Sequence, residues 1–181
     1  MALKTKPRKT VDDYLRLPEG ALAELIEGEI LTSPSPRFRH QKAVLNLAAI
    51  LREHSRSRGL GLVLAAPMDV HLPSGDIVQP DVLFLASNNP ARREDWIRGV
   101  PDLIVEVLSP ENPERDRLVK RRLYEQNAVR KYWIVDPEER SVEILGLSGS
   151  AFSPLGYFQE PDTLTSSVLA GLELPVREIF A

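Results

Sequence analysis

Two nearly continuous apolar runs constrain the fold of this chain more than any other feature of its sequence. One run covers residues 82–85 and directly follows Asp81, and the other covers residues 103–105 and directly precedes Glu106. Apolar runs of this length are typical of strands that are buried on both faces of a sheet. The sequence therefore predicts a central sheet with other elements packed on each side of it.

The segments around these runs predict the packed elements. Apolar residues spaced three to four positions apart predict a long helix over residues 37–58, which ends at Gly59. A second helix is predicted over residues 114–127, and the polar residues 88–99 predict a loop or a short helix. Further strands are predicted at residues 62–65, 68–72, 77–85 (broken only by Pro80), 102–108, 130–135 and 141–147. This order predicts an α/β fold in which helices flank a mixed central sheet.

Smaller elements are predicted at both ends of the chain. Residues 22–26 and 29–32 predict an extra N-terminal β-hairpin, and C-terminal strands lead to a helical turn at residues 176–180. The chain has no repeat and no dividing linker. We therefore expect a mobile basic tail over residues 1–9 and a single domain over residues 10–181.

The composition excludes several classes of function. Because the chain has no cysteine, disulfides and thiolate metal sites are excluded, and any metal would need oxygen or histidine ligands. A phosphate-binding Gly-rich loop and a Gly-x-Ser-x-Gly turn are also missing, which argues against P-loop ATPases and serine hydrolases. The net charge of −3 is unusual for a nucleic-acid binder, although local charge counts for more. With neither a secretory signal nor an apolar stretch of about 20 residues, the chain is expected to be cytoplasmic.

Asp81 and Glu106 are the strongest candidates for chemistry, because each interrupts an otherwise apolar strand. Strand alternation places each on the same face as buried leucine or isoleucine positions, where an ionised carboxylate is costly unless it is compensated. A divalent cation such as Mg²⁺ would compensate both, since it binds carboxylate oxygens together with water and phosphate. The alternative is that both acids are solvated at strand ends or pair with lysine or arginine.

A basic segment follows the Glu106 strand and supplies the next candidates. Lys120 could lean from its helix towards the metal site, where it would assist the attacking water and offset phosphate charge. Alternatively, it forms an ordinary helix-surface pair with Asp116, four residues earlier. The flanking arginines are candidates for contacts with DNA phosphates, with a solvated helix face as the alternative; these are Arg115, Arg117, Arg121 and Arg122.

Two further residues are weaker candidates. Glu24 lies in the first predicted hairpin and is either an additional acid of the site or an exposed strand residue. His40 lies near the start of the long helix on its apolar side, where it would line the site or serve in packing.

A series of short motifs resembles the Uma-two family of restriction endonucleases, within the PD-(D/E)XK nuclease superfamily. The motifs occur in order and span nearly the whole chain. They are residues 24–29 (ELIEGE), 34–36 (PSP), 40–41 (HQ), 78–84 (VQPDVLF), 101–110 (PDLIVEVLSP), Lys120 with Tyr124, and 132–137 (YWIVDP). The resemblance implies a restriction-endonuclease-like fold and a divalent-metal site at Asp81 and Glu106, with Glu24 nearby.

The sequence departs from the general nuclease pattern at one position. Leu108 stands two residues after Glu106, where that pattern usually has a lysine. The resemblance suggests that Lys120, on the following helix, takes over this role from a different backbone position.

These observations and the family resemblance together predict a metal-dependent endonuclease that hydrolyses DNA with Mg²⁺ or Mn²⁺. The resemblance to proteins of this fold also suggests a homodimer that cuts both strands, although the sequence shows no interface. Two alternatives remain open. A non-catalytic module that keeps the fold would bind DNA or a protein partner without metal. A small-molecule hydrolase would use the same carboxylates and be indifferent to DNA.

Overall fold

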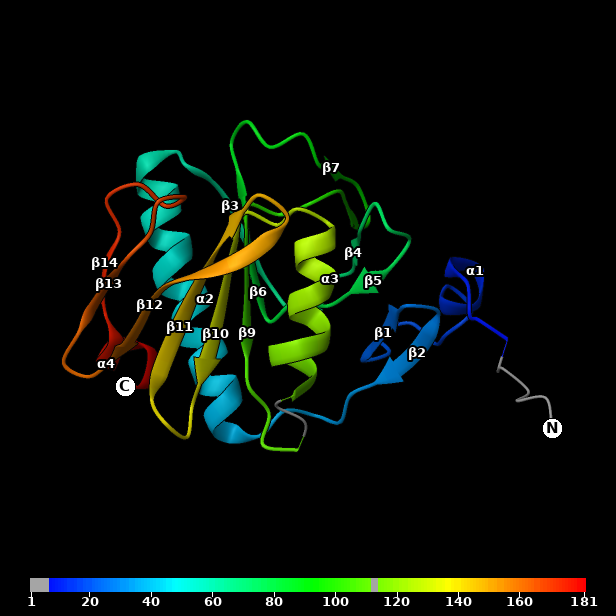
Figure 1. Cartoon of the computed structure of the whole chain (residues 1–181), viewed down its shortest axis with the longest axis horizontal. Coiled ribbons are helices and arrows are strands. Elements are labelled where there is room, and N and C mark those ends of the chain that lie inside the picture. Colours follow the sequence, from blue (N-terminus) through cyan, green and yellow to red (C-terminus); the bar gives the residue numbers. More distant parts are fainter. Residues whose placement is uncertain (1–6, 112–113) are drawn as a thin grey trace.

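The computed structural model describes residues 7–111 and 114–181 and is built around a six-stranded mixed sheet (Figure 1). Strands β9 and β10 are parallel, and all other neighbours in this sheet are antiparallel. In spatial order, the strands are β12 (Ala151–Gln159), β11 (Ser141–Ser148), β10 (Lys131–Asp136), β9 (Leu103–Val107), β6 (Val82–Ala86) and β3 (Gly61–Ala65). The predicted mixed α/β architecture is confirmed.

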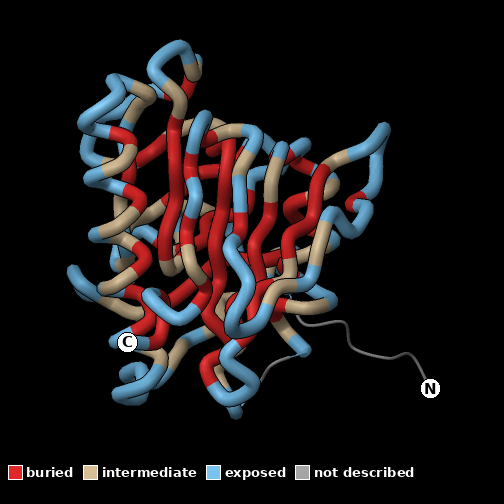
Figure 2. The backbone as a smooth tube through the Cα atoms, turned by 90° about the vertical axis from the view of Figure 1, so that its left-hand side faces the viewer, coloured by how far each residue is buried: buried red, intermediate tan, exposed pale blue. Residues whose placement is uncertain are grey.

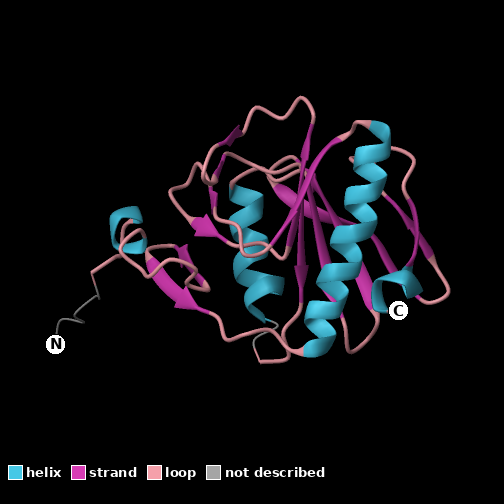
Figure 3. Ribbon diagram, turned by 180° about the vertical axis from the view of Figure 1, so that it is seen from behind, coloured by secondary structure: helices cyan, strands magenta, loops and turns pink. Residues whose placement is uncertain are grey.

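Helices cover both faces of this central sheet. The long helix α2 (Phe38–Arg58) lies on one face, and helix α3 (Arg121–Gln126) lies on the other (Figures 1 and 3). Alternate residues of β6 point into two separate cores: Phe84 packs in the α2 core and Leu83 in the α3 core. The central strands are accordingly buried along most of their length (Figure 2), as their apolar runs predicted.

A second sheet of short strands lies beside α3 (Figure 1). It contains the predicted N-terminal hairpin. In spatial order its strands are β2 (Glu29–Thr32), β1 (Ala23–Ile26), β5 (Ile77–Val78), β4 (Val70–His71), β8 (Ile97–Arg98) and β7 (Arg92–Arg93). A single turn of helix, α1 (Val11–Tyr14), precedes the hairpin and is capped by Thr10, which forms a capping box with Asp13.

The C-terminal segment closes the α2 side of the molecule. Strands β13 (Thr163–Thr165) and β14 (Glu173–Pro175) pair with each other, and helix α4 (Val176–Phe180) packs against α2. None of the helices described in the structure is both long and apolar enough to cross a membrane.

Two sequence predictions of secondary structure were wrong, and a third was incomplete. Residues 77–85 form two strands in different sheets, because Pro80 lacks the N–H that would continue a ladder and the chain changes sheet there. Residues 88–99 contain the short strands β7 and β8 in place of a plain loop or a helix. The predicted helix over residues 114–127 begins with a π-helix, η1 (Arg115–Lys120), a form often found at functional sites.

The predicted N-terminal tail is only partly described. Residues 1–6 lie outside the described residues. The backbone N–H of Lys9 donates to the carbonyl of Gly28 at 2.7 Å, and the Arg8 guanidinium donates to the carbonyl of Glu27. The hairpin turn therefore holds residues 8 and 9, which were expected to be mobile.

Candidate active site

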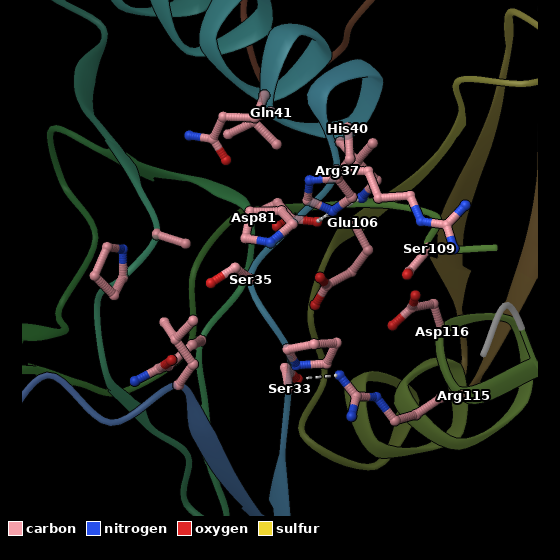
Figure 4. A pocket seen from close by; sticks show the side chains of 18 of the residues that line it. Ser33, Ser35, Arg37, His40, Gln41, Asp81, Glu106, Ser109, Arg115 and Asp116 are labelled. Atoms are coloured by element: carbon pink, nitrogen blue, oxygen red, sulfur yellow. Dashed lines mark hydrogen bonds and ion pairs between the residues drawn. The ribbon is translucent and has the colours of Figure 1, made fainter. Parts of the chain in front are cut away.

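A cavity of about 480 Å³ lies where the two sheets meet the start of α2 and the π-helix η1 (Figure 4). Five carboxylates from separate segments of the chain line it, together with four groups that can carry positive charge. These residues are Glu24, Asp81, Glu106, Glu111 and Asp116, with Arg37, His40, Arg115 and Lys120. All four residues of the predicted catalytic set, and His40, are thus brought to one cavity.

Asp81 and Glu106 are held next to each other by strand pairing. Strands β6 and β9 pair with Val82 opposite Val105, so the next positions along this antiparallel register are Asp81 and Glu106. The Oδ2 atom of Asp81 accepts a 2.7 Å hydrogen bond from the backbone N–H of Val107, which fixes the carboxylate against β9. Figure 4 shows both carboxylates facing the same space.

Lys120 is buried in the middle of the acids. Its side chain is only 4% exposed, and its Nζ atom lies 2.9 Å from Glu106 Oε1 and 3.0 Å from Glu24 Oε1. The expected surface pair with Asp116 is also present, but at 3.6 Å it is the longest of the three contacts. The lysine is therefore directed to residues far away in the sequence, and its ammonium reaches the predicted site.

Glu24 connects the hairpin to this cluster. Its Oε1 atom also accepts the backbone N–H of Gln79 at 2.9 Å, close to the point where the chain changes sheet. Its Oε2 atom is buried and has no hydrogen-bond partner within the described part of the chain, although Arg115 lies 3.5 Å away. Arg115 in turn donates to the hydroxyl of Ser33 at 3.0 Å (Figure 4).

Two tyrosines support the cluster, and the sequence assigned a role to neither. The fully buried Tyr124 donates its hydroxyl proton to Glu106 Oε1 at 2.5 Å, sharing that oxygen with Lys120. The hydroxyl of Tyr132 donates to the backbone carbonyl of Asp116 at 2.9 Å and so anchors η1 to the sheet. The available signal was spacing, since Asp116, Lys120 and Tyr124 recur every four residues along one helical face.

A known protein family matches most of this chain. Residues 11–177 match the Uma2 family, whose description is "Putative restriction endonuclease". This chain belongs to the Uma2 family. The family resemblance carried by the sequence motifs is thereby confirmed.

A solved structure has the same fold as this Uma2 chain. It is the crystal structure of "a putative nuclease belonging to DUF820" from Anabaena variabilis ATCC 29413, with a TM-score of 0.80 and 21% sequence identity. The match covers 94% of this chain and 97% of the other. The predicted restriction-endonuclease-like fold is confirmed. A search of curated proteins returned no match.

Burial and mutual repulsion raise the pKa values of two acids in the Uma2 site, Glu106 and Asp116. Burial raises the pKa of Glu106 to about 8, with Lys120 opposing and the other carboxylates adding to the shift. Burial also raises the pKa of Asp116. Five acids therefore line the cavity with a smaller number of cations, and the surplus negative charge favours either protons or an added cation.

The pKa values of Lys120 and His40 are raised, which favours the charged forms of both side chains. Burial acts to lower the pKa of Lys120, but the surrounding carboxylates outweigh it, with Glu106 first, and the pKa is raised above its usual range. Burial likewise acts to lower the pKa of His40, but the Asp81 carboxylate, 3.3 Å from His40 Nε2, outweighs it and raises this pKa. Lys120 is consequently a cation throughout the neutral range.

The arginines predicted to contact DNA do not form one surface. Arg115 lines the cavity, whereas Arg117 turns away to Glu143 at 3.2 Å and to Asp136 at 3.6 Å. Arg121 pairs with Glu125 and donates to the carbonyl of Phe152, and Arg122 is exposed. Their alternation around a helix explains the dispersal, because successive helical residues point in different directions.

The donor chemistry of the cavity suits a hard divalent cation. Over residues 7–111 and 114–181, no three acidic, histidine or cysteine side chains are already gathered closely enough to hold a metal. Mg²⁺ needs less than that, because it is commonly bound by one or two carboxylates with water and substrate phosphate. Glu106 directs one oxygen to Lys120 and Tyr124, and Asp81 directs one to Val107, which leaves one oxygen of each outside these hydrogen bonds. The residues present therefore fit such an ion.

Proposed function

We propose that this protein is a metal-dependent endonuclease that hydrolyses DNA phosphodiester bonds in this cavity. One observation carries the proposal. The buried Lys120 ammonium lies within 3.0 Å of Glu24 and Glu106, although Leu108 occupies the position where a lysine was expected. Two acids and a lysine, the residue types of the general nuclease pattern, are thus brought together although the lysine comes from a different segment of the chain.

Asp81 and Glu106 are the residues that would hold Mg²⁺ or Mn²⁺. A bound divalent ion supplies a water molecule of lowered pKa and stabilises the negative charge that develops on the phosphate. Tyr124 and Lys120 orient Glu106 for this task, and the Val107 N–H orients Asp81.

The raised pKa of Lys120 decides how this residue takes part. Hydrolysis adds water across a P–O bond, so one group must accept a proton from the water and the leaving oxygen must gain one. Because Lys120 keeps its proton at neutral pH, it positions the water and offsets phosphate charge, and it does not act as the base. Asp116, whose pKa is raised by burial and which is not one of the two proposed metal ligands, is the group suited to accept that proton.

DNA is the proposed partner, and Arg115 is the arginine best placed to meet it. Its guanidinium lies in the cavity wall with a side chain about one-fifth exposed (21%), so it can neutralise a phosphate next to the scissile bond. Cleavage of both strands of a duplex would further require two copies of the chain, which we propose as a homodimer. Sedimentation of the protein with and without duplex DNA tests that point.

The decisive experiment is cleavage of supercoiled plasmid and of single-stranded DNA with Mg²⁺, with Mn²⁺ and with EDTA. We expect cleavage with either metal, none in EDTA, and none from Asp81→Ala under any condition. DNA binding without cleavage, retained in Asp81→Ala, would instead indicate a non-catalytic binding module. Metal-dependent hydrolysis of a small phosphodiester that excess DNA does not inhibit would indicate a small-molecule hydrolase.

A further inference from the structure

Phe38 is the most exposed large hydrophobic side chain in the described residues. It begins helix α2, and 81% of its surface is open to solvent. Hollows of about 290 Å³ and about 310 Å³ flank it, and Phe38 lines both. The aromatic ring therefore stands between two shallow spaces instead of filling a core.

The first of these hollows adjoins the active-site cavity, because the two share wall residues. Arg37 and His40 line both, on either side of Phe38 in the sequence. The rest of its wall is formed by the apolar residues Leu108, Pro110 and Pro137 and by the charged pair Arg39 and Glu138. A group bound against Phe38 would thus lie beside a group bound at Asp81, which His40 contacts.

Positive charge surrounds this hollow. Arg37 and Arg39 flank Phe38, and Lys42 follows one turn later. Arg37 is paired with Glu111 and Arg39 with Glu138, but all four side chains are largely exposed, and such pairs are weak enough to exchange for another anion. The first turn of α2 also contains no acidic residue that would repel one. A flat apolar surface with cations around it complements a nucleotide, which joins a flat base to a phosphate.

We propose that the hollow beside Phe38 is a subsite for an unpaired nucleobase, which stacks on the Phe38 ring while the neighbouring phosphate lies in the active site. This inference rests on the proposed function and specifies its substrate class. A base within an intact duplex is stacked on its neighbours and cannot reach the ring without leaving them. The subsite therefore selects single-stranded DNA, frayed ends or mismatches over continuous duplex.

Binding in EDTA tests the subsite separately from cleavage. The probe is a single-stranded oligonucleotide that carries one 2-aminopurine, whose fluorescence falls when the base stacks. We expect wild-type protein to quench this fluorescence, and Phe38→Ala to weaken binding about ten-fold and abolish the quenching. Phe38→Trp should retain both. Leu45→Ala is the matched control, because Leu45 is an exposed residue of the same helix (66%) that lines neither hollow.

The outcomes separate this inference from the proposed function. If wild-type protein never cleaves DNA but quenching still depends on Phe38, the nuclease proposal fails and the subsite stands. If wild-type protein cleaves DNA, and Phe38→Ala and Leu45→Ala match it in affinity, quenching and strand preference, the subsite is overturned and the nuclease proposal stands. A Phe38→Ala protein with unchanged DNA binding but an altered sedimentation coefficient would assign Phe38 to contact with a second copy, which also overturns the subsite.

Discussion

At the scale of the residue, the orientation of the Glu106 carboxylate depends on the hydrogen bonds to one of its oxygen atoms, Oε1. This oxygen accepts from both Tyr124 and Lys120 deep in the protein, and one donor is neutral whereas the other is charged. Two donors on one oxygen restrict rotation of the carboxylate and direct its other oxygen elsewhere. Each donor can be removed by a substitution of nearly the same size, so their roles can be separated.

Replacing Tyr124 with phenylalanine removes the hydroxyl and keeps the packing of the ring. We expect the fold to persist and Mn²⁺ affinity, measured by titration calorimetry, to fall about 10- to 100-fold, as is usual when a group that orients a metal ligand is lost. Tyr132→Phe is the control, because its hydroxyl bonds to the carbonyl of Asp116 and touches no candidate ligand. Equal losses in the two variants would contradict a specific role for the hydrogen bond from Tyr124 to Glu106.

Lys120→Met should affect both stability and activity. Removal of one partner from a buried ionic cluster costs about 3–5 kcal/mol of unfolding free energy, and the cost should be smaller at pH 5, where the acids can protonate. Cleavage by the folded fraction should fall by a factor of about 10² or more. Arg117→Met, on the same π-helix but 40% exposed, should change stability by about 1 kcal/mol or less in urea titrations. Full activity in Lys120→Met would show that the acids matter without the lysine.

At the scale of the element, the π-helix η1 divides its charged residues between two surfaces. It directs Asp116 and Lys120 inwards and Arg115 towards the hairpin, while Arg117 contacts acids of β10 and β11. Five basic residues within eight positions therefore do not act as one patch. Local net charge in the sequence overestimates the positive surface that a ligand can meet.

This division predicts which arginine affects DNA binding. Each phosphate that the protein neutralises contributes about −0.9 to the slope of log affinity against log salt concentration. Arg115→Ala should therefore make this slope less negative by about 0.9, the contribution of one phosphate contact. Arg117→Ala should leave the slope unchanged, because its guanidinium is already paired with Asp136 and Glu143. Fluorescence anisotropy at several salt concentrations measures both. A flatter slope in an Arg121→Ala/Arg122→Ala double variant, but not in Arg115→Ala, would place DNA on the outer face of the helix instead.

At the scale of the whole molecule, segments far apart in the sequence bring acids into one cavity, where the carboxylates repel one another. The helices and both sheets must all be in place for Glu24, Asp81, Glu106 and Asp116 to meet. In the unfolded chain these carboxylates are far apart and titrate normally. Stability should therefore depend on pH in a way that no single element would show.

The sign of that dependence follows from the shifted pKa values. Glu106 has a pKa of about 8 in the folded state and 4.5 when unfolded, so the unfolded chain releases its proton first and stability falls as pH rises between these values. The raised pKa of Asp116 acts in the same direction, and so does that of His40, whose stabilising charge is lost as pH rises through its folded pKa. Thermal melts in EDTA from pH 5 to 9 should show a falling Tm.

Two controls accompany these melts. Glu106→Gln should flatten the curve, because it removes the acid whose pKa is raised to about 8 in the folded state. Saturating Mn²⁺ should raise the Tm most at high pH, since a metal binds the deprotonated carboxylates and competes with protons. A Tm that is independent of pH in EDTA would contradict the repulsion described here.

The sequence by itself determined the parts that depend on local pattern. The apolar runs predicted strands buried on both faces, because burial on two sides removes the alternation seen in half-exposed strands. The spacing within residues 37–58 predicted α2 to within one residue of its start, and the motif order identified the family. The same runs also singled out Asp81 and Glu106, since a carboxylate in an apolar strand is conspicuous in sequence alone.

Only the tertiary structure decided how these residues meet. Lys120 could equally have paired with Asp116 on a surface, and the packing of η1 over β9 directs it to Glu106 and Glu24 instead. Tyr124 had no role assigned from the sequence, where it appeared only in a motif with Lys120, and its bond to Glu106 is visible only in the fold. Residues 77–85 were predicted as one strand, but the chain passes from one sheet to the other at Pro80. Contacts of this kind join residues tens of positions apart. Their geometry is set by how whole layers pack, and a local pattern of apolar and polar residues does not encode it.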